Sequence, residues 1–83
     1  MNYTLVWTPN AERQLTELWL NAADRTAVQF ASDQIEFALR TSPDDKGESR
    51  EGEYRMLLMK PLGVKFRIIE ADRIVRIVRV WAF

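Results

Sequence analysis

The chain has 83 residues, of which twelve are basic and twelve acidic, so its formal net charge is zero. This length excludes a second domain, and the absence of cysteine and histidine excludes disulfides, thiolate nucleophiles, imidazole acid–base chemistry and the commonest metal ligands. No apolar stretch approaches the roughly 20 residues that cross a membrane. We therefore expect a single domain over residues 1–83 that is cytoplasmic, has no membrane partner and needs no metal or cofactor.

The N-terminal half predicts one strand followed by two helices. Residues 3–7, YTLVW, are aromatic and β-branched, as strands favour. Thr8 and Pro9 then form a helix start, and Asp24 is the capping candidate of a second helix. Because the connection between them is short, the two helices are expected to pack as an antiparallel hairpin. Apolar residues at helical spacing follow each start: Ala11, Leu15, Leu18, Trp19 and Ala22 in the first helix, and Val28, Ala31, Ile35, Ala38 and Leu39 in the second.

The C-terminal half predicts an antiparallel meander of three strands. Residues 43–52, PDDKGESREG, are charged and rich in turn formers, which predicts a loop. The stretches 54–59, 64–70 and 73–83 are rich in β-branched and large apolar residues and are separated by turn signals. The predicted fold is therefore α+β: an N-terminal strand, an antiparallel helical hairpin and a three-stranded antiparallel meander, with the helices on one face of the sheet.

Arginine recurs at every third position of the last predicted strand, as Arg73, Arg76 and Arg79. On a helix this spacing would form a basic stripe, but the stiff and bulky residues between the arginines favour a strand. Strict alternation then places Arg73 and Arg79 on one face and Arg76 on the other. The expected companions on the first face are Val75, Ile77 and Trp81, and those on the second are Ile74, Val78 and Val80. In the middle strand of the meander, the residues expected in the core are Val64, Phe66 and Ile68.

The positive charge is concentrated in the predicted sheet. The net charge is −4 over residues 1–52 and +4 over residues 53–83. Because adjacent strands lie about 4.8 Å apart, several basic side chains can gather on the open face and bind phosphate. Alternatively they are solvated, or pair with the acids of the predicted loop. The basic residues are Arg55, Lys60, Lys65, Arg67, Arg73, Arg76 and Arg79, and the loop acids are Asp44, Asp45, Glu48 and Glu51.

Most aromatic side chains are expected in the core or at its edge, but five leave other roles open. Tyr54, beside a basic residue, can stack on a base of single-stranded RNA. Phe30 and Phe37 lie off the apolar stripe of the second helix and can face the flank of the sheet, the other helix or a partner. Trp81 and Phe83, two residues apart, belong either to the core edge or to an apolar patch that binds a partner.

Three long segments together resemble a known family. YTLVWTPNAERQLTELW looks like the opening strand and first helix of the RelE/ParE superfamily of type II toxin–antitoxin toxins, the plasmid stabilisation proteins. IEFALRTSPDDKGESREGEYRMLL resembles the family's second helix, loop and following strand, and PLGVKFRIIEADRIVRIVRV resembles its paired last strands. The resemblance covers essentially the whole chain. It implies the α+β fold given above, inhibition of growth, and a cognate antitoxin as partner.

The two branches of the superfamily imply different sites. In the ribonuclease branch, which cuts mRNA on the ribosome, Arg55 matches a basic strand position and Lys65 matches the arginine that follows the family's glycine, with Arg67 as a further catalytic cation. Leu57 stands where a second lysine is expected, and the family's C-terminal arginine and tyrosine lie beyond Phe83, the last residue of this sequence. The resemblance to the gyrase-inhibiting branch implies the same fold but no set of catalytic residues.

Three functions therefore stay open. Slightly favoured is a toxin that inhibits DNA gyrase or acts in another non-nucleolytic way. The first alternative is a ribosome-dependent mRNA endonuclease, and the second is a non-toxic binding module of the same fold. The residues expected to contact nucleic acid or another target are Tyr54, Arg55, Lys60 and Arg79, and those expected to contact a partner are Trp81 and Phe83.

Overall fold

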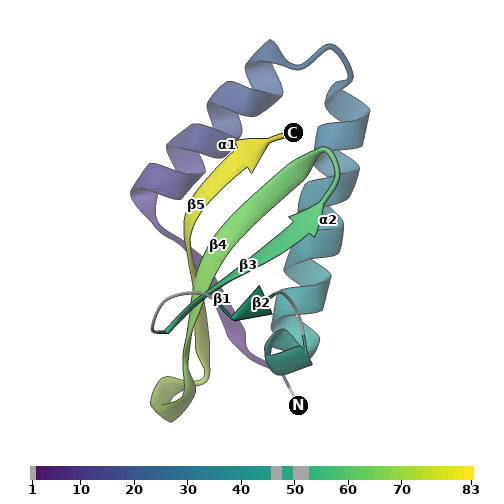
Figure 1. Cartoon of the computed structure of the whole chain (residues 1–83). Helices are drawn as coiled ribbons and strands as arrows, with labels where there is room; N and C mark the ends of the chain where they lie inside the picture. Colours follow the sequence, from purple (N-terminus) through teal and green to yellow (C-terminus); the bar gives the residue numbers. More distant parts are fainter. Residues whose placement is uncertain (1, 46–47, 50–52) are drawn as a thin grey trace.

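The computed structural model describes residues 2–45, 48–49 and 53–83. Its strands form one sheet in the order β1-β5-β4-β3-β2. Both helices pack on one face of this sheet, as predicted, with α1 beside β5 and α2 on the side of β3 (Figure 1). Neither helix has the length and hydropathy needed to cross a bilayer. In chain order the elements are β1 (Thr4–Trp7), α1 (Pro9–Asn21), α2 (Arg25–Thr41), the short 3-10 helix η1 (Pro43–Asp45), β2 (Glu48–Ser49), β3 (Tyr54–Met59), β4 (Leu62–Ile69), the 3-10 helix η2 (Glu70–Asp72) and β5 (Ile74–Ala82).

The sheet contains the predicted meander and one strand that the sequence did not predict. β3, β4 and β5 are antiparallel neighbours, and β1 adds to β5 in the parallel direction. β2 pairs with β3 and lies inside the segment predicted as a loop. The loop prediction is wrong at these two residues, because a strand of two residues has no periodicity to detect. The rest of the predicted loop, 46–47 and 50–52, lies outside the described residues. β4 begins two residues earlier than expected, since the turn before it uses only Lys60 and Pro61.

Both helices begin at the predicted capping residues. Thr8 accepts a hydrogen bond from the backbone N–H of Ala11 at 3.2 Å, and Asp24 accepts one from Ala27 at 3.0 Å. Pro9 occupies the first turn of α1, where its missing N–H leaves no bond unmade. Each cap satisfies a backbone donor that no helical carbonyl reaches, and this fixes where the helix starts.

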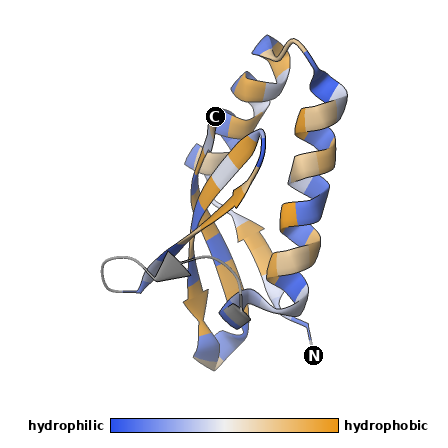
Figure 2. Ribbon diagram, turned by 45° about the vertical axis from the view of Figure 1, so that its right-hand side comes forward, coloured by the Kyte–Doolittle hydropathy of each residue, from blue (hydrophilic) through white to orange (hydrophobic). Residues whose placement is uncertain are grey.

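The core lies between the helices and the sheet. Along the helices and several strands, hydrophobic residues are interspersed with hydrophilic ones (Figure 2). Trp7 Nε1 donates a hydrogen bond to the carboxylate of Glu36 at 2.8 Å, which fastens β1 to α2. Trp19, predicted on the buried stripe of α1, is 37% exposed and stacks on the guanidinium of Arg25 at 4.8 Å. The largest fully buried apolar side chains of the helices and strands are Ile35, Leu39, Leu62, Val64, Phe66, Val75 and Ile77.

A bulge interrupts the regular alternation of β5. Phe66 of β4 lies opposite Ile77, whereas its neighbour Lys65 lies opposite Arg79. Val78 is therefore an extra residue with no partner in β4. Such an insertion moves every following side chain to the other face of the strand.

The bulge makes the predicted grouping of the arginines wrong. Arg76 and Arg79 lie on the same face, away from the helices, and Trp81 lies with them. The prediction assumed an uninterrupted strand, and nothing in the sequence marks the bulge. Arg73 precedes β5 in the left-handed backbone region, with φ of 52°, and its guanidinium stacks on the ring of Tyr3 at 4.0 Å. The residues of β5 buried on the helix side are Val75, Ile77 and Val80.

The outer edge of β5 is covered in two ways, by a paired strand and by a side chain. β1 pairs with β5 only as far as Ile77. Beyond that point the side chain of Gln14, on α1, accepts a hydrogen bond from the backbone N–H of Val80 at 3.0 Å. The glutamine thus takes the place of a neighbouring strand, which protects this part of the edge from pairing with another chain.

Gly63 lies within β4, although the sequence analysis placed it in a turn. The indole of Trp81, its neighbour on β5, covers the glycine so closely that a Cβ atom there would meet the indole Cε2 at 2.6 Å. The absence of a side chain is therefore required for Trp81 to lie flat against the sheet.

We expect Gly63→Ala to lower the free energy of unfolding by about 1–3 kcal/mol, because the added methyl group displaces the Trp81 ring. Urea titration followed by circular dichroism measures the change. The matched control is Gly63→Ala in a Trp81→Ala background, where the methyl group meets no ring and the loss should largely vanish. A Gly63→Ala variant as stable as the wild type would contradict this account of the packing.

Candidate functional site

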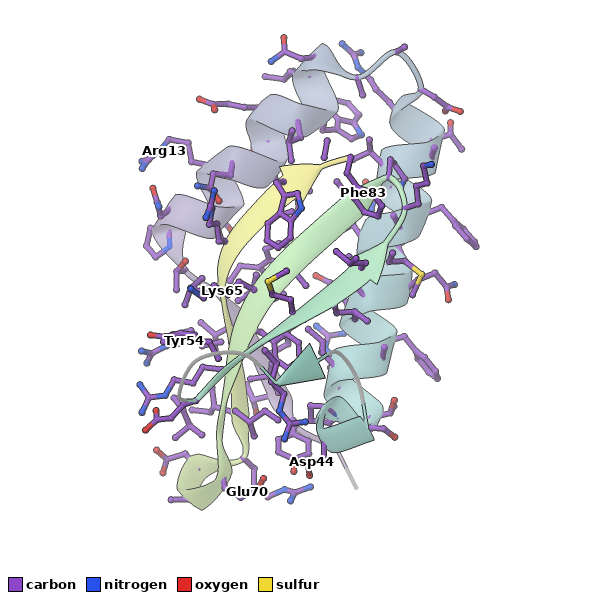
Figure 3. The ribbon with its side chains drawn as sticks, viewed as in Figure 1. Arg13, Asp44, Tyr54, Lys65, Glu70 and Phe83 are labelled. Carbon is purple, nitrogen blue, oxygen red and sulfur yellow. The ribbon has the colours of Figure 1, made fainter. Side chains whose placement is uncertain are left out.

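The candidate site is the face of the sheet that the helices leave uncovered, referred to below as the open face. β3, β4 and β5 supply most of it, since opposed residues of neighbouring strands point to the same side. In Figure 3, Tyr54 and Lys65 lie close together beside β3 and β4. The residues on this face are Thr4, Val6, Tyr54, Met56, Leu58, Gly63, Lys65, Arg67, Ile69, Ile74, Arg76, Arg79 and Trp81.

Four cations meet in two opposed pairs at the centre of the open face. Lys65 lies opposite Arg79, and Arg67 lies opposite Arg76. Like charges placed directly opposite each other destabilise a sheet, so this arrangement has an energetic cost. Arg67 is compensated by Glu53, whose carboxylate lies 2.5 Å from its Nε. Among the side chains that the structure describes, no carboxylate lies within ion-pair distance of the other three cations.

Two aromatic rings flank the Lys65–Arg79 pair. The Lys65 ammonium lies 4.9 Å from the centre of the Tyr54 ring, and the Arg79 guanidinium lies 5.8 Å from the Trp81 ring. Tyr54, Lys65, Arg79 and Trp81 thus form a row across β3, β4 and β5, referred to below as the cation row. Cations bind phosphate oxygens, and aromatic faces stack on exposed bases, so the row offers both contacts that a single-stranded nucleic acid uses.

The structure separates three of the predicted site residues from the cation row. Arg55 lies on the helix side of β3, where its Nη1 donates a hydrogen bond to the backbone carbonyl of Asp44 at 2.7 Å. Lys60 lies in the turn between β3 and β4, at the end of the sheet. Phe83 lies beyond β5, about half exposed, and its backbone N–H donates to the Pro61 carbonyl at 2.9 Å.

The structure brings the other predicted residues together, and it adds one. Tyr54, Lys65, Arg67, Arg79 and Trp81 all lie on the open face. The sequence analysis counted the remaining cation of this face, at position 76, among the basic residues of the sheet but assigned it to the opposite side. Only the bulge corrects this, because it brings positions 76 and 79 to one face.

Tyr3 belongs to a separate polar cluster at the other end of the sheet. Its hydroxyl donates to the Glu70 carboxylate, whose two oxygens lie at 3.0 and 3.1 Å, and Asp44 Oδ2 lies at 3.3 Å. Burial of the phenol, followed by the hydrogen bond to Glu70, raises the pKa of Tyr3 above its ordinary value. Through these hydrogen bonds the hydroxyl joins the residue before β1 to η1 and η2. Within the described part of the chain, no group of three acidic side chains is placed to hold a metal ion.

The sequence matches no family model and no curated protein. The structure, however, is similar to solved toxin–antitoxin proteins over nearly its whole length. The toxin–antitoxin complex RelBE2 from Mycobacterium tuberculosis aligns with a TM-score of 0.75 and 24% identity, covering 100% of both chains. The chromosomal ParDE system of P. aeruginosa aligns with a TM-score of 0.76 and 20% identity, covering 96% of this chain and 95% of that one. At such identities the likeness shows the fold, which is that of RelE and ParE.

Part of a longer protein has the same fold. TrmO from Pseudomonas aeruginosa aligns with a TM-score of 0.66 and 22% identity, over 98% of this chain but only 36% of that one. The fold therefore occurs both as a small chain and as a portion of a larger one. The fold by itself does not decide the activity.

We expect Arg79→Glu to raise the free energy of unfolding by roughly 0.5–1 kcal/mol at low salt, because it turns a repulsive cross-strand pair with Lys65 into an attractive one. Urea titration at low ionic strength measures the gain. In about 1 M salt the difference should disappear, since charges at the surface are then screened. If Arg79→Glu is the less stable protein at low salt, the two cations do not repel each other significantly.

Proposed function

We propose that the chain is the toxin of a type II toxin–antitoxin pair, acting as a single cytoplasmic domain that its cognate antitoxin holds inactive. The toxin binds its cellular target through the open face and inhibits it without cutting nucleic acid, as a ParE-like inhibitor of DNA gyrase would. The observation that carries this proposal is the cation row, a set of clustered positive charges flanked by two aromatic rings on the uncovered side of the sheet.

The fold supports the toxin role. The similar structures include complexes of RelE with RelB, from bacteria and from the archaeon Pyrococcus horikoshii, and a ParDE toxin–antitoxin system. They align with 96% or more of this chain, so the likeness extends over the whole sheet and both helices. A partner chain is expected on physical grounds as well, because a domain of this size buries only about 60% of the surface its unfolded chain exposes.

The charge of the open face supports an anionic target. Lys65 and Arg79 are kept side by side although their repulsion destabilises the sheet. An arrangement that is unfavourable in the free protein becomes favourable when phosphate or carboxylate groups bind between the cations. The chain as a whole is neutral, so this attraction is local to the sheet and does not extend to the helices.

The chemistry of the open face supports binding over cleavage. Strand cleavage needs a group that takes a proton from the nucleophile and one that gives a proton to the leaving group. The carboxylate of Glu53 is engaged by Arg67. Tyr3 is held in its own cluster with a raised pKa, and Arg55, one of the three cations expected to be catalytic, is bound on the other face. The described residues of the face include four cations that can hold an anion, whereas Tyr54 and Lys65 are the ones among them of a type that can transfer a proton.

A ribosome-dependent mRNA endonuclease is the second candidate. It is favoured by one observation, namely that Lys65 and Arg67 point to the same side as Tyr54, so that two of the three predicted catalytic cations can contact one RNA strand. The likeness to part of TrmO is the observation in favour of the third candidate, a non-toxic binding module.

Induced expression in a bacterial host separates these functions. We expect growth arrest, intact translated mRNA by primer extension and altered supercoiling of a reporter plasmid. The double variant Lys65→Ala, Arg79→Ala should restore colony counts by at least about tenfold, since two charge-assisted contacts are lost. Arg13→Ala removes a cation on the exposed side of α1 and should leave the arrest unchanged.

Three other outcomes each have a clear meaning. Growth arrest with cut mRNA would establish the endonuclease and overturn the binding mechanism. Arrest by the double variant at full strength would show that the cation row is not the target site. Normal growth on expression of the wild type would show that the chain is not a toxin and would favour the non-toxic binding module.

The antitoxin is tested separately. We expect the product of a short reading frame next to the gene to restore growth when both are expressed, and to co-purify with the chain. A disordered segment that folds on the toxin surface is a suitable partner, because it can cover a wide area of a small domain. If no neighbouring product rescues growth or co-purifies, the assignment to a toxin–antitoxin pair fails even where the chain alone is toxic.

A further inference from the structure

We propose that Glu53 acts as an internal ligand of the open face. In the free protein its carboxylate occupies the anion position at Arg67, and an anionic target has to displace it in order to bind all the cations of the face. The inference rests on the proposed function in one respect, namely that the target is anionic. It makes a single residue responsible for the balance between the stability of the free sheet and its affinity for a polyanion.

The four cations of the open face define two anion positions, because they lie in two opposed pairs. Lys65 and Arg79 form one position, and Arg67 and Arg76 form the other. Two residues separate the pairs along β4, which corresponds to about 6.7 Å. Among the side chains that the structure describes, a carboxylate lies within ion-pair distance only at the second position, where Glu53 reaches Arg67. A ligand with several negative charges therefore finds one position open and the other occupied.

Glu53 reaches the open face because it lies just before a strand rather than within it. Tyr54, the first residue of β3, lies opposite Arg67. In a regular strand the residue before Tyr54 would point to the helix side. Glu53 instead belongs to a turn, and its carboxylate lies 2.5 Å from Nε of Arg67. The turn thus places an acid beside a cation that the register of the sheet directs to the open face.

The contact between Glu53 and Arg67 is of a kind that a better ligand can replace. The Nε atom of Arg67 is buried, yet it forms no hydrogen bond to any atom that the structure describes, so charge alone holds the pair. The side chain of Glu53 is 66% exposed, and such an ion pair contributes at most about fivefold to an equilibrium constant. A phosphate or carboxylate that approaches in the plane of the guanidinium accepts two parallel hydrogen bonds from it.

In the free protein the same contact offsets a repulsion. Arg67 lies directly opposite Arg76, and like charges in this arrangement destabilise a sheet. Glu53 supplies a negative charge there until the target does. The residue therefore has opposite effects on two measurable quantities, since it raises the stability of the free protein and lowers its affinity for a polyanion. An ion pair with a purely structural role would have the first effect only.

Fluorescence anisotropy of a labelled oligothymidylate of about twelve nucleotides tests the affinity, when the purified chain is added at several salt concentrations. We expect Glu53→Gln to bind this probe about three- to tenfold more tightly than the wild type at low salt, because Arg67 is released for a phosphate. The plot of log K against log salt concentration should also become steeper by about 0.7, which is the contribution of one further phosphate contact to a single strand.

Two controls separate the release of Arg67 from a change in net charge. In an Arg67→Ala background, Glu53→Gln should leave binding unchanged, since the cation that it releases is gone. Glu12→Gln removes the same charge from an exposed position of α1, on the side of the sheet away from the open face, and should bind the probe as the wild type does.

Thermal unfolding followed by circular dichroism tests the effect on stability and checks that each variant folds. At low ionic strength we expect Glu53→Gln to lower the melting temperature by about 2–4 °C, because Arg67 and Arg76 then repel each other without compensation. Tighter binding together with lower stability is the pattern that the internal ligand predicts.

Unchanged or weaker binding by Glu53→Gln, or an equal gain in affinity from Glu12→Gln, would overturn the inference while the open face remained an anion-binding surface. If neither the wild type nor Glu53→Gln binds the probe, the inference and the anionic target of the proposed function fail together. Binding by the variant alone would support the inference. All these measurements use purified protein, so they are independent of whether the chain arrests growth.

Discussion

The arrangement of charge in this protein depends on a single inserted residue, Val78. The sheet has to place apolar side chains against the helices and charged ones in water, and β5 carries both kinds along its whole length. With regular alternation, Arg79 would point toward the helices beside Ile77, where an unpaired guanidinium is strongly disfavoured. The bulge shifts the pattern by one residue, so that Val80 enters the core and the arginine reaches the open face.

The same shift makes the open face a site. It brings Arg79 next to Lys65 and turns Trp81 toward Gly63, so that one local irregularity assembles the cations and positions an aromatic ring beside them. Bulges recur next to functional sites because they redirect a few side chains while the rest of the ladder stays in register. In this chain the apolar layer and the cation row are therefore not independent features. A sequence change that removed the bulge would damage both at once.

Much of the fold could be predicted because its determinants are local. The caps Thr8 and Asp24, the helical spacing of apolar residues and the turn-separated β-rich stretches each act over a few positions, and the likeness to solved RelE and ParE structures confirms the fold they predict. The errors arose where distant parts meet. The direction of Arg55 depends on a carbonyl in η1, and the partner of β1 is the last strand. The sequence also allowed several surroundings for the phenylalanines of α2, because periodicity excludes a residue from the core without identifying what it meets.

The pairing of β1 with β5 has a consequence for the order in which the protein can be completed. Thr4 and Ile74 are neighbours in the sheet, and Tyr3 is joined to Glu70, so the first strand has its partners almost a whole chain length away. During synthesis β1 leaves the ribosome first and must wait, while the helical hairpin, whose contacts are near in sequence, can form at once. The meander closes last, and the cation row is assembled from its three strands in that step. The open face is thus absent from the growing chain until β5, the third of its main strands, has been synthesised.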